Sequence, residues 1–231
     1  MAVSHFGGRK FFNPKIISNM DTSEVQKIYT KRASYYQFLM VDFLGFGAAI
    51  EKFFREFDYV KSHFKILDAG CGTGNATRAL YTIAREKGYE NVVFHAFDLT
   101  QTMLDLFQEW IKKVRANNIF LKQANVLDLE QLPSDWNGYD CIVSTAMLEH
   151  LPKDSVRQAL RGLKQLLKHN GRLLVVITRR NIINKFIGWR WKNNMYDKNE
   201  LQKIFSDVGF SEFKIRNFFW NFMFIIEAKN N

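Results

Sequence analysis

Hydrophobic positions follow two different patterns along the chain, and the pattern changes near residue 64. Upstream of it, a helix is expected over residues 21–36, with Asp21-Thr22-Ser23-Glu24 as a plausible cap. Apolar residues at mixed three- and four-residue spacing predict a second helix over residues 38–57. Downstream, short apolar runs alternate with amphipathic stretches. The runs predict strands at 65–68, 92–97, 119–123, 141–144 and 172–177, and the stretches predict helices at 75–87, 101–116, 154–168 and 198–207. This alternation is typical of parallel βαβ units in a doubly wound sheet.

The end of the chain follows a different pattern. Residues 213–218 and 222–228 read as two strands joined by the short segment Phe219-Trp220-Asn221, which predicts an antiparallel hairpin. We therefore expect an α/β fold in which a parallel sheet is closed by a hairpin. We divide the chain into an N-terminal helical cap, residues 1–60, and a core of the same domain, residues 61–231.

Composition limits the function classes less than the pattern does. The 231 residues are 47% hydrophobic and carry a formal charge of +10. Because Lys and Arg are spread along the chain, we read the charge as a contribution to solubility, although nucleic acid, an anionic membrane surface or an acidic substrate would also suit it. Two cysteines without metal-like spacing predict reduced thiols and a cytoplasmic protein. No run reaches the 18 apolar residues of a membrane span.

The residues with the clearest chemistry follow the first predicted strand. Ile66-Leu67-Asp68 leads through Ala69 into Gly70-Cys71-Gly72-Thr73-Gly74, and a helix opens at Asn75. Alternate glycines let the backbone approach a ligand, and the helix start offers N–H groups to a carboxylate. A dinucleotide site has the spacing G-x-G-x-x-G. Here the spacing is D-x-G-x-G-x-G, and Asp68 can receive the α-ammonium of an amino-acid cofactor; the plainer interpretation is a tight turn alone.

The next two strand ends carry further polar residues. Asp98 can accept hydrogen bonds from both hydroxyls of a ribose, or Asp98 or Thr100 can cap the helix that follows. After the third strand, Asn125 and Asp128 compete to read an adenine amine, and Asn125 is preferred. Val126 then supplies an apolar contact to the ring.

The loop after the fourth strand should border the reacting group, because ligands lie beyond the carboxyl ends of parallel strands. It runs from Thr145 to Pro152. His150 is the candidate general base, with an ordinary pKa suited to neutral pH, or it only buttresses the loop. Glu149 orients a substrate, or is merely solvated.

Together these residues resemble the class I S-adenosylmethionine-dependent methyltransferases, especially the small-molecule branch that includes the ubiquinone biosynthesis enzymes. The resemblance covers roughly residues 29–228, with residues 68–74 similar to motif I and residues 139–140 with 148–151 similar to motif IV. It implies a three-layer Rossmann-like fold whose seven-stranded sheet is mostly parallel with an antiparallel C-terminal strand, and S-adenosylmethionine as cofactor. The expected cofactor-binding residues are Tyr29, Asp68, Ala69, Gly70, Cys71, Gly72, Gly74, Asp98, Leu99, Met103, Asn125, Val126 and Thr145.

Two departures from the family pattern matter. Asn125 stands where many relatives carry an aspartate, and its amide oxygen can still receive the adenine amine. Ala146 stands where metal-binding relatives carry the first glutamate of E-x-x-E-H. One carboxylate and one imidazole make a thin metal shell, so we expect no metal.

Aromatic residues mark the expected acceptor site. Tyr29 or Tyr36 can lie against the sulfonium or the methionyl arm, as in the family's N-terminal segment, or can pack between helices. Residues 179–199 interleave rings and cations, and Trp189 and Trp191 there are candidate substrate residues with Tyr36 and Glu149. Such a segment suits an aromatic or amphipathic acceptor, and also nucleic-acid stacking or peripheral membrane contact.

Three functions stay open in order of preference. The first is methyl transfer to a small molecule. The second is an RNA or protein methyltransferase, which the charge favours, although Ser144-Thr145-Ala146-Met147 lacks the Asn/Asp-Pro-Pro-aromatic loop of many base-amine methyltransferases. The third is a non-catalytic cofactor-binding partner subunit. The glycine spacing disfavours a NAD enzyme, and the pattern sets neither the acceptor atom nor the oligomeric state.

Overall fold

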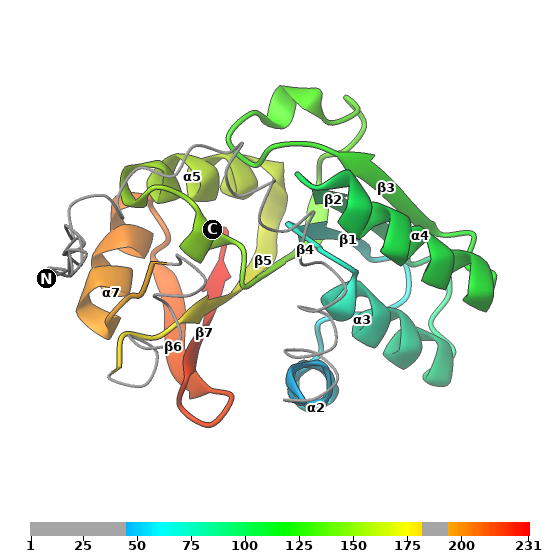
Figure 1. The fold of residues 1–231 in the computed structure, drawn as a ribbon, viewed down its shortest axis with the longest axis horizontal. Helices are drawn as coiled ribbons and strands as arrows, with labels where there is room; N and C mark the ends of the chain where they lie inside the picture. The colour runs from blue at the N-terminus through cyan, green and yellow to red at the C-terminus, as the bar shows by residue number, and fades with distance from the viewer. Residues whose placement is uncertain (1–44, 182–193) are drawn as a thin grey trace, which may run out of the picture.

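A computed structural model describes residues 45–181 and 194–231 of the chain. Strands and helices alternate through most of this part (Figure 1). The strands are β1 Lys65–Ala69, β2 Val93–Asp98, β3 Ile119–Gln123, β4 Tyr139–Thr145, β5 Leu167–Thr178, β6 Glu212–Phe218 and β7 Met223–Lys229. The helices are α2 Phe46–Glu56, α3 Asn75–Glu86, α4 Gln101–Val114, α5 Val156–Leu166 and α7 Lys198–Asp207, with short 3-10 turns η3 Leu129–Gln131, η4 Leu148–His150 and η5 Lys153–Ser155.

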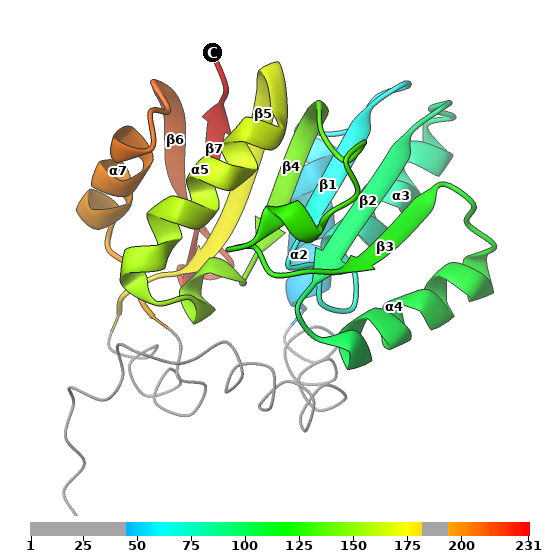
Figure 2. The same ribbon diagram turned by 90° about the horizontal axis from the view of Figure 1, so that it is seen from above.

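All seven strands form one sheet in the order β3-β2-β1-β4-β5-β7-β6 (Figure 2). The five strands from β3 to β5 are parallel neighbours, and β7 runs antiparallel to both β5 and β6. The expected mostly parallel sheet with an antiparallel C-terminal strand is therefore confirmed. Strand β7 enters between β5 and β6, so β6 forms the edge of the sheet.

Helices cover both faces of the sheet and make three layers. Helices α2, α3 and α4 bury their apolar sides on one face, and α5 and α7 bury theirs on the other. Figure 1 shows α5 above the sheet and α2 and α3 below it. Strands β4 and β5 are buried over most of their length, as expected for strands covered by helices on both faces.

Some predicted boundaries differ from the structure. The helix expected over 154–168 begins with η5 and ends at Leu166, and β5 starts at Leu167, because Leu167 already pairs with Tyr139 of β4. Of the helix expected over 38–57, the described part is α2. The helix expected over 21–36 lies outside the described residues, and so does most of the predicted cap. Within the described ranges, no helix is long and apolar enough to cross a membrane.

Candidate functional site

The glycine loop joins β1 to α3 in a conformation that glycine favours. Gly70, Gly72 and Gly74 have φ angles of 70°, 53° and 86°, in the left-handed region that costs other residues free energy. A Cβ on Gly70 would lie 2.2 Å from Cγ of Met147, and one on Gly74 would lie 2.3 Å from Cε2 of Phe107. The loop thus needs its first and last glycines for packing as well as for its turn.

The loop is tied to the end of β2 by hydrogen bonds. The backbone amides of Gly70 and Cys71 donate to the carbonyl of Phe97 across 2.9 and 3.0 Å. The amide of Gly72 donates to Oδ2 of Asp98 across 2.8 Å, and the amide of Thr100 donates to Oδ1 across 2.8 Å. Burial raises the pKa of Asp98, and these amide bonds oppose that rise. Thr100 is the N-cap residue of α4, without a side-chain cap bond.

Asp68 lies at the base of the same loop. Its side chain is 1% exposed, and Oδ2 accepts hydrogen bonds from the amide and the hydroxyl of Thr77 across 3.1 and 2.7 Å. These bonds link the end of β1 to the first turn of α3. Burial raises the pKa of Asp68 to about 7. Its Oδ1 is buried and has no hydrogen-bond partner among the described residues, which leaves one acceptor for a donor from outside that part of the chain.

A pocket opens along the carboxyl ends of the parallel strands. Its lining comes from the glycine loop, the ends of β2 and β3, and the loop after β4. Ten of the predicted site residues line it, namely Gly70, Cys71, Gly72, Asp98, Leu99, Met103, Asn125, Val126, Thr145 and His150. The remaining described candidates, Asp68, Ala69, Gly74 and Glu149, lie behind this wall.

The end of β3 supplies the apolar and amide part of the wall. Val126 and Met103 are buried side chains of the pocket. Oδ1 of Asn125 accepts a hydrogen bond from the amide of Leu127 across 3.0 Å, which holds the side chain in an Asx turn. Asp128, the competing candidate, binds Gln131 across 2.6 Å and does not line the pocket. The geometry therefore favours Asn125 over Asp128.

The loop after β4 forms the opposite wall. Ala146 has a φ of 55° and Met147 packs onto Gly70, so the loop bends back over the glycine loop. His150 follows in η4 and lines the pocket. Burial lowers the pKa of His150 to about 4, and an interaction with the backbone of Ala146 partly opposes this. The imidazole is therefore neutral at pH 7 and able to accept a proton, though it is a weak base.

Glu149 is placed differently from its neighbour. Its side chain is 1% exposed, and Oε1 accepts a hydrogen bond from the hydroxyl of Thr178 across 2.8 Å. Burial raises the pKa of Glu149 to about 7, and its Oε2 has no hydrogen-bond partner among the described residues. The interpretation of Glu149 as a solvated loop residue is wrong. If Glu149 orients a substrate, it must do so through buried neighbouring groups, because its own side chain does not line the pocket.

Sequence reasoning missed several residues of the pocket wall. Phe97 and Ala124 adjoin predicted residues and could have been found from strand ends. Phe46 belongs to α2, far from every motif, and no local signal indicates it. The pocket residues that were not predicted are Phe46, Thr73, Asn75, Phe97, Thr100 and Ala124. Ala146, Met147, Leu151 and Pro152 were not singled out, but they belong to the loop that was expected to border the reacting group.

Four predicted residues cannot be placed, because Tyr29, Tyr36, Trp189 and Trp191 lie outside the described residues. Within residues 45–181 and 194–231, no group of three or more His, Cys, Asp or Glu side chains is positioned to hold a metal ion. Cys71 and Cys141 are buried free thiols.

The sheet order and the pocket together resemble those of one class of protein. A doubly wound sheet closed by an inserted antiparallel strand, with an acid-led glycine loop at the first strand and an acid at the second, is the arrangement of class I S-adenosylmethionine-dependent methyltransferases. A family model described as "Methyltransferase domain" matches residues 66–171. Residues 66–171 therefore match a methyltransferase domain, in agreement with the resemblance found in the sequence.

Individual proteins that are similar to this chain are named as methyltransferases. The chain is 29% identical over 179 residues to the ubiquinone/menaquinone biosynthesis C-methyltransferase UbiE of Yersinia enterocolitica, in a match that covers 75% of this chain and 64% of that protein. Among solved structures, a magnesium protoporphyrin IX methyltransferase of Synechocystis with bound SAH is similar with a TM-score of 0.69 at 16% identity, over 91% of this chain and all of that one. An Aquifex aeolicus SAM-dependent methyltransferase has a TM-score of 0.65 at 19% identity, over 92% of this chain and 100% of the other. These structural likenesses show the fold.

Proposed function

We propose that this protein transfers a methyl group from S-adenosylmethionine to a small-molecule acceptor that is aromatic or amphipathic. The observation that carries the proposal is the Asp98 carboxylate, which is held in the pocket wall by the amide of Gly72 and borders the glycine loop. The names of the relatives support a small-molecule acceptor, since they refer to quinone and porphyrin methylation.

The residues of the pocket fit this cofactor. Asp98 offers carboxylate oxygens to ribose hydroxyls, and Asn125 with Val126 and Met103 offers an amide beside apolar contacts for adenine. The loop amides at the start of α3 suit the carboxylate of the methionyl arm. Oδ1 of Asp68, which has no partner in the part of the chain that the structure describes, is an acceptor suited to the ammonium group. Because Asp68 is buried, this contact calls for a bridging water or a small movement of the loop.

When bound, the cofactor supplies a methyl group on a sulfonium, an electrophile that needs no further activation. The chain then has three tasks, which are to align the acceptor with the methyl–sulfur bond, to exclude water and to remove a proton where the acceptor carries one. Thr145, Ala146 and Met147 border the place where the acceptor would stand. His150 is our candidate for the proton acceptor, and its neutral imidazole suits an acceptor whose own proton is fairly acidic.

We also propose that residues 1–60 and 61–231 form one domain in a cytoplasmic protein. Helix α2 already belongs to the apolar cluster that covers α3 and α4, and its Phe46 reaches the pocket. The two cysteines are buried apart from each other as free thiols, as in proteins of a reducing compartment.

Calorimetry tests the cofactor, and a transfer assay tests the reaction. S-adenosylmethionine should bind and NAD should not; absence of S-adenosylmethionine binding would sink the proposal. Methyl-labelled cofactor should then label material in the low-molecular-weight fraction of a metabolite extract. Label confined to RNA or to protein would favour the alternative acceptors, and cofactor binding without any transfer would favour the non-catalytic partner.

A further inference from the structure

The turn between β6 and β7 presents large aromatic side chains at the surface. Trp220 is 74% exposed, and its ring stacks on Phe219 with centroids 5.2 Å apart and planes 14° apart. Among the described residues, the large hydrophobic side chains that are clearly exposed are Trp220 and Phe120. We call residues 218–222, which hold the rings of Phe218, Phe219, Trp220 and Phe222, the aromatic tip.

The backbone of the tip is unusual. Phe219, Trp220 and Asn221 have φ angles of 46°, 49° and 70°, three consecutive left-handed residues without a glycine. Each such residue costs free energy, and bulky aromatic residues rarely adopt this conformation. Trp220 buries little of its side chain in the fold, apart from its stacking on Phe219. Strain kept at an exposed position is a reason to look for a function there.

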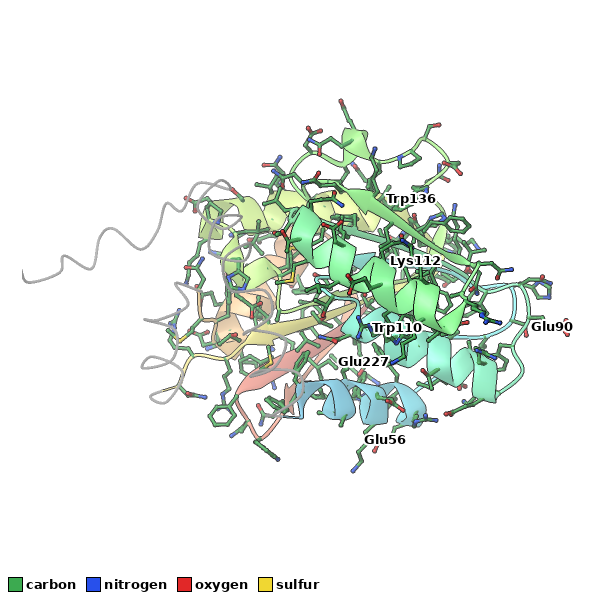
Figure 3. The ribbon with its side chains drawn as sticks, turned by 45° about the vertical axis from the view of Figure 1, so that its right-hand side comes forward. Glu56, Glu90, Trp110, Lys112, Trp136 and Glu227 are labelled. Carbon is green, nitrogen blue, oxygen red and sulfur yellow. The ribbon has the colours of Figure 1, made fainter. Side chains whose placement is uncertain are left out.

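Basic side chains lie near the tip. Among the described residues, Lys52 of α2, Arg216 of β6 and the acid Glu56 line the groove between the helix and the hairpin. Figure 3 shows α2, with Glu56 labelled, alongside the β6–β7 hairpin. Arg179, at the end of β5, donates to Asn217 and Asn221 and so lies beside the turn. Arg216 also pairs with Glu227, which offsets part of its charge. The chain as a whole carries a formal charge of +10.

The tip lies at the same end of the sheet as the pocket, where the parallel strands have their carboxyl ends. Met223, the first residue of β7, pairs with Thr178 at the end of β5, and Thr145 of the pocket pairs with Val176 two residues earlier in β5. Phe46 connects the two places. Its ring lines the pocket, and its centroid lies 6.3 Å from that of Phe218 and 5.6 Å from that of Phe219.

We propose that the aromatic tip docks this protein onto an anionic lipid surface. Exposed tryptophan and phenylalanine rings insert into the interfacial region of a bilayer, while nearby Lys and Arg are attracted to anionic headgroups. A second copy of the chain suits the surface less well, because a repeated basic rim would face itself. Docking would bring the mouth of the pocket to the lipid, so that an acceptor could enter from the membrane surface. This route for the acceptor rests on the proposed function, whereas lipid binding itself does not.

Flotation of the full-length protein with vesicles tests the proposal. The protein should float with phosphatidylcholine vesicles that contain phosphatidylglycerol, and binding should weaken without phosphatidylglycerol or at high salt. W220S and F219S should each reduce the vesicle-bound fraction several-fold. The matched control is F120S, because Phe120 is 48% exposed on β3, at the opposite edge of the sheet from β6. It should bind like the wild type.

Two further measurements keep the test decisive. Calorimetry with S-adenosylmethionine should give the same affinity for W220S as for the wild type, which shows that the variant is folded and separates a failure here from a failure of the proposed function. Sedimentation velocity should show the same mass for both proteins. The proposal is overturned if wild type ignores the anionic vesicles, if W220S binds them as well as wild type, or if W220S lowers the mass, which would make the tip a contact between copies.

Discussion

The carboxylate of Asp98 accepts the backbone amide of Gly72 across 2.8 Å and so joins the ends of two neighbouring parallel strands at the pocket wall. Asp98 thereby shapes the glycine loop and also lines the pocket. We expect D98A to weaken S-adenosylmethionine binding by about ten- to a hundredfold, the cost of losing one or two hydrogen bonds to a charged group. D98N should lie between D98A and wild type.

Isothermal calorimetry measures both variants, and D105N is the matched control. Asp105 is an exposed acid on α4 that binds Gln101 across 2.8 Å. Its substitution should leave cofactor affinity unchanged. Unaltered affinity in D98A, with the fold intact by circular dichroism, would remove Asp98 from the cofactor site.

The glycines of the loop should differ in what their substitution costs. A Cβ on Gly70 would overlap Met147, whereas one on Gly72 meets no protein atom within 4 Å. G72A should therefore cost only its left-handed backbone, about 1–2 kcal/mol of unfolding free energy. G70A should cost about 1–3 kcal/mol more, because the core must also move. Urea unfolding midpoints compare the two variants. Equal losses of unfolding free energy would show that the Met147 side chain moves aside at little cost.

Much of this site could be predicted from local sequence because its parts follow strand ends. An apolar run, an acid and spaced glycines are all within nine residues of each other, and parallel topology then brings Asp98 and Asn125 to the same edge. The insertion of β7 between β5 and β6 was not predictable in this way. It depends on packing over the whole sheet, and so does the contact of Phe46 with the pocket.

The burial of Glu149 is the clearest example of what local sequence does not contain. The pattern Leu148-Glu149-His150 places an acid in a loop after the fourth strand, next to a histidine. In the fold, Thr178 arrives from β5, and Asn194 donates its amide to the carbonyl of Glu149 across 2.7 Å. Residues about 30 and 45 positions away in the chain thus close over the side chain. A polar residue was expected to be solvated, and tertiary contacts decided otherwise.

Glu149 should change how the free energy of unfolding depends on pH. Its pKa is about 7 when folded and near 4.5 when unfolded, so the folded state holds the extra proton between these values. Glu149 therefore contributes stability at low pH that is lost as pH rises from about 4.5 to about 7. In E149Q the side chain keeps nearly the same shape as glutamate but does not titrate. The unfolding free energy of E149Q relative to wild type should rise by up to about 3 kcal/mol over this window.

The comparison with wild type is necessary because other buried groups titrate in the same range. Asp68 acts in the same direction as Glu149, since burial raises its pKa to about 7. His95 and His150 act in the opposite direction, since their lowered pKa values, about 4, make the folded state gain stability as pH rises to 6.5. Urea unfolding at several pH values supplies the difference curve. A flat difference would mean that folding does not raise the pKa of Glu149.

Substitutions of His150 distinguish a catalytic role of this side chain from a structural one. A glutamine amide can replace the imidazole in contact with the backbone of Ala146, but it cannot accept a proton near neutral pH. If His150 removes a proton from the acceptor, H150Q should keep its cofactor affinity and melting temperature while kcat falls by about 100-fold. If His150 only buttresses the loop, H150Q should retain kcat and H150A should lose stability. Single-turnover transfer from labelled cofactor to the acceptor found in the screen, measured beside both melting temperatures, distinguishes the two results.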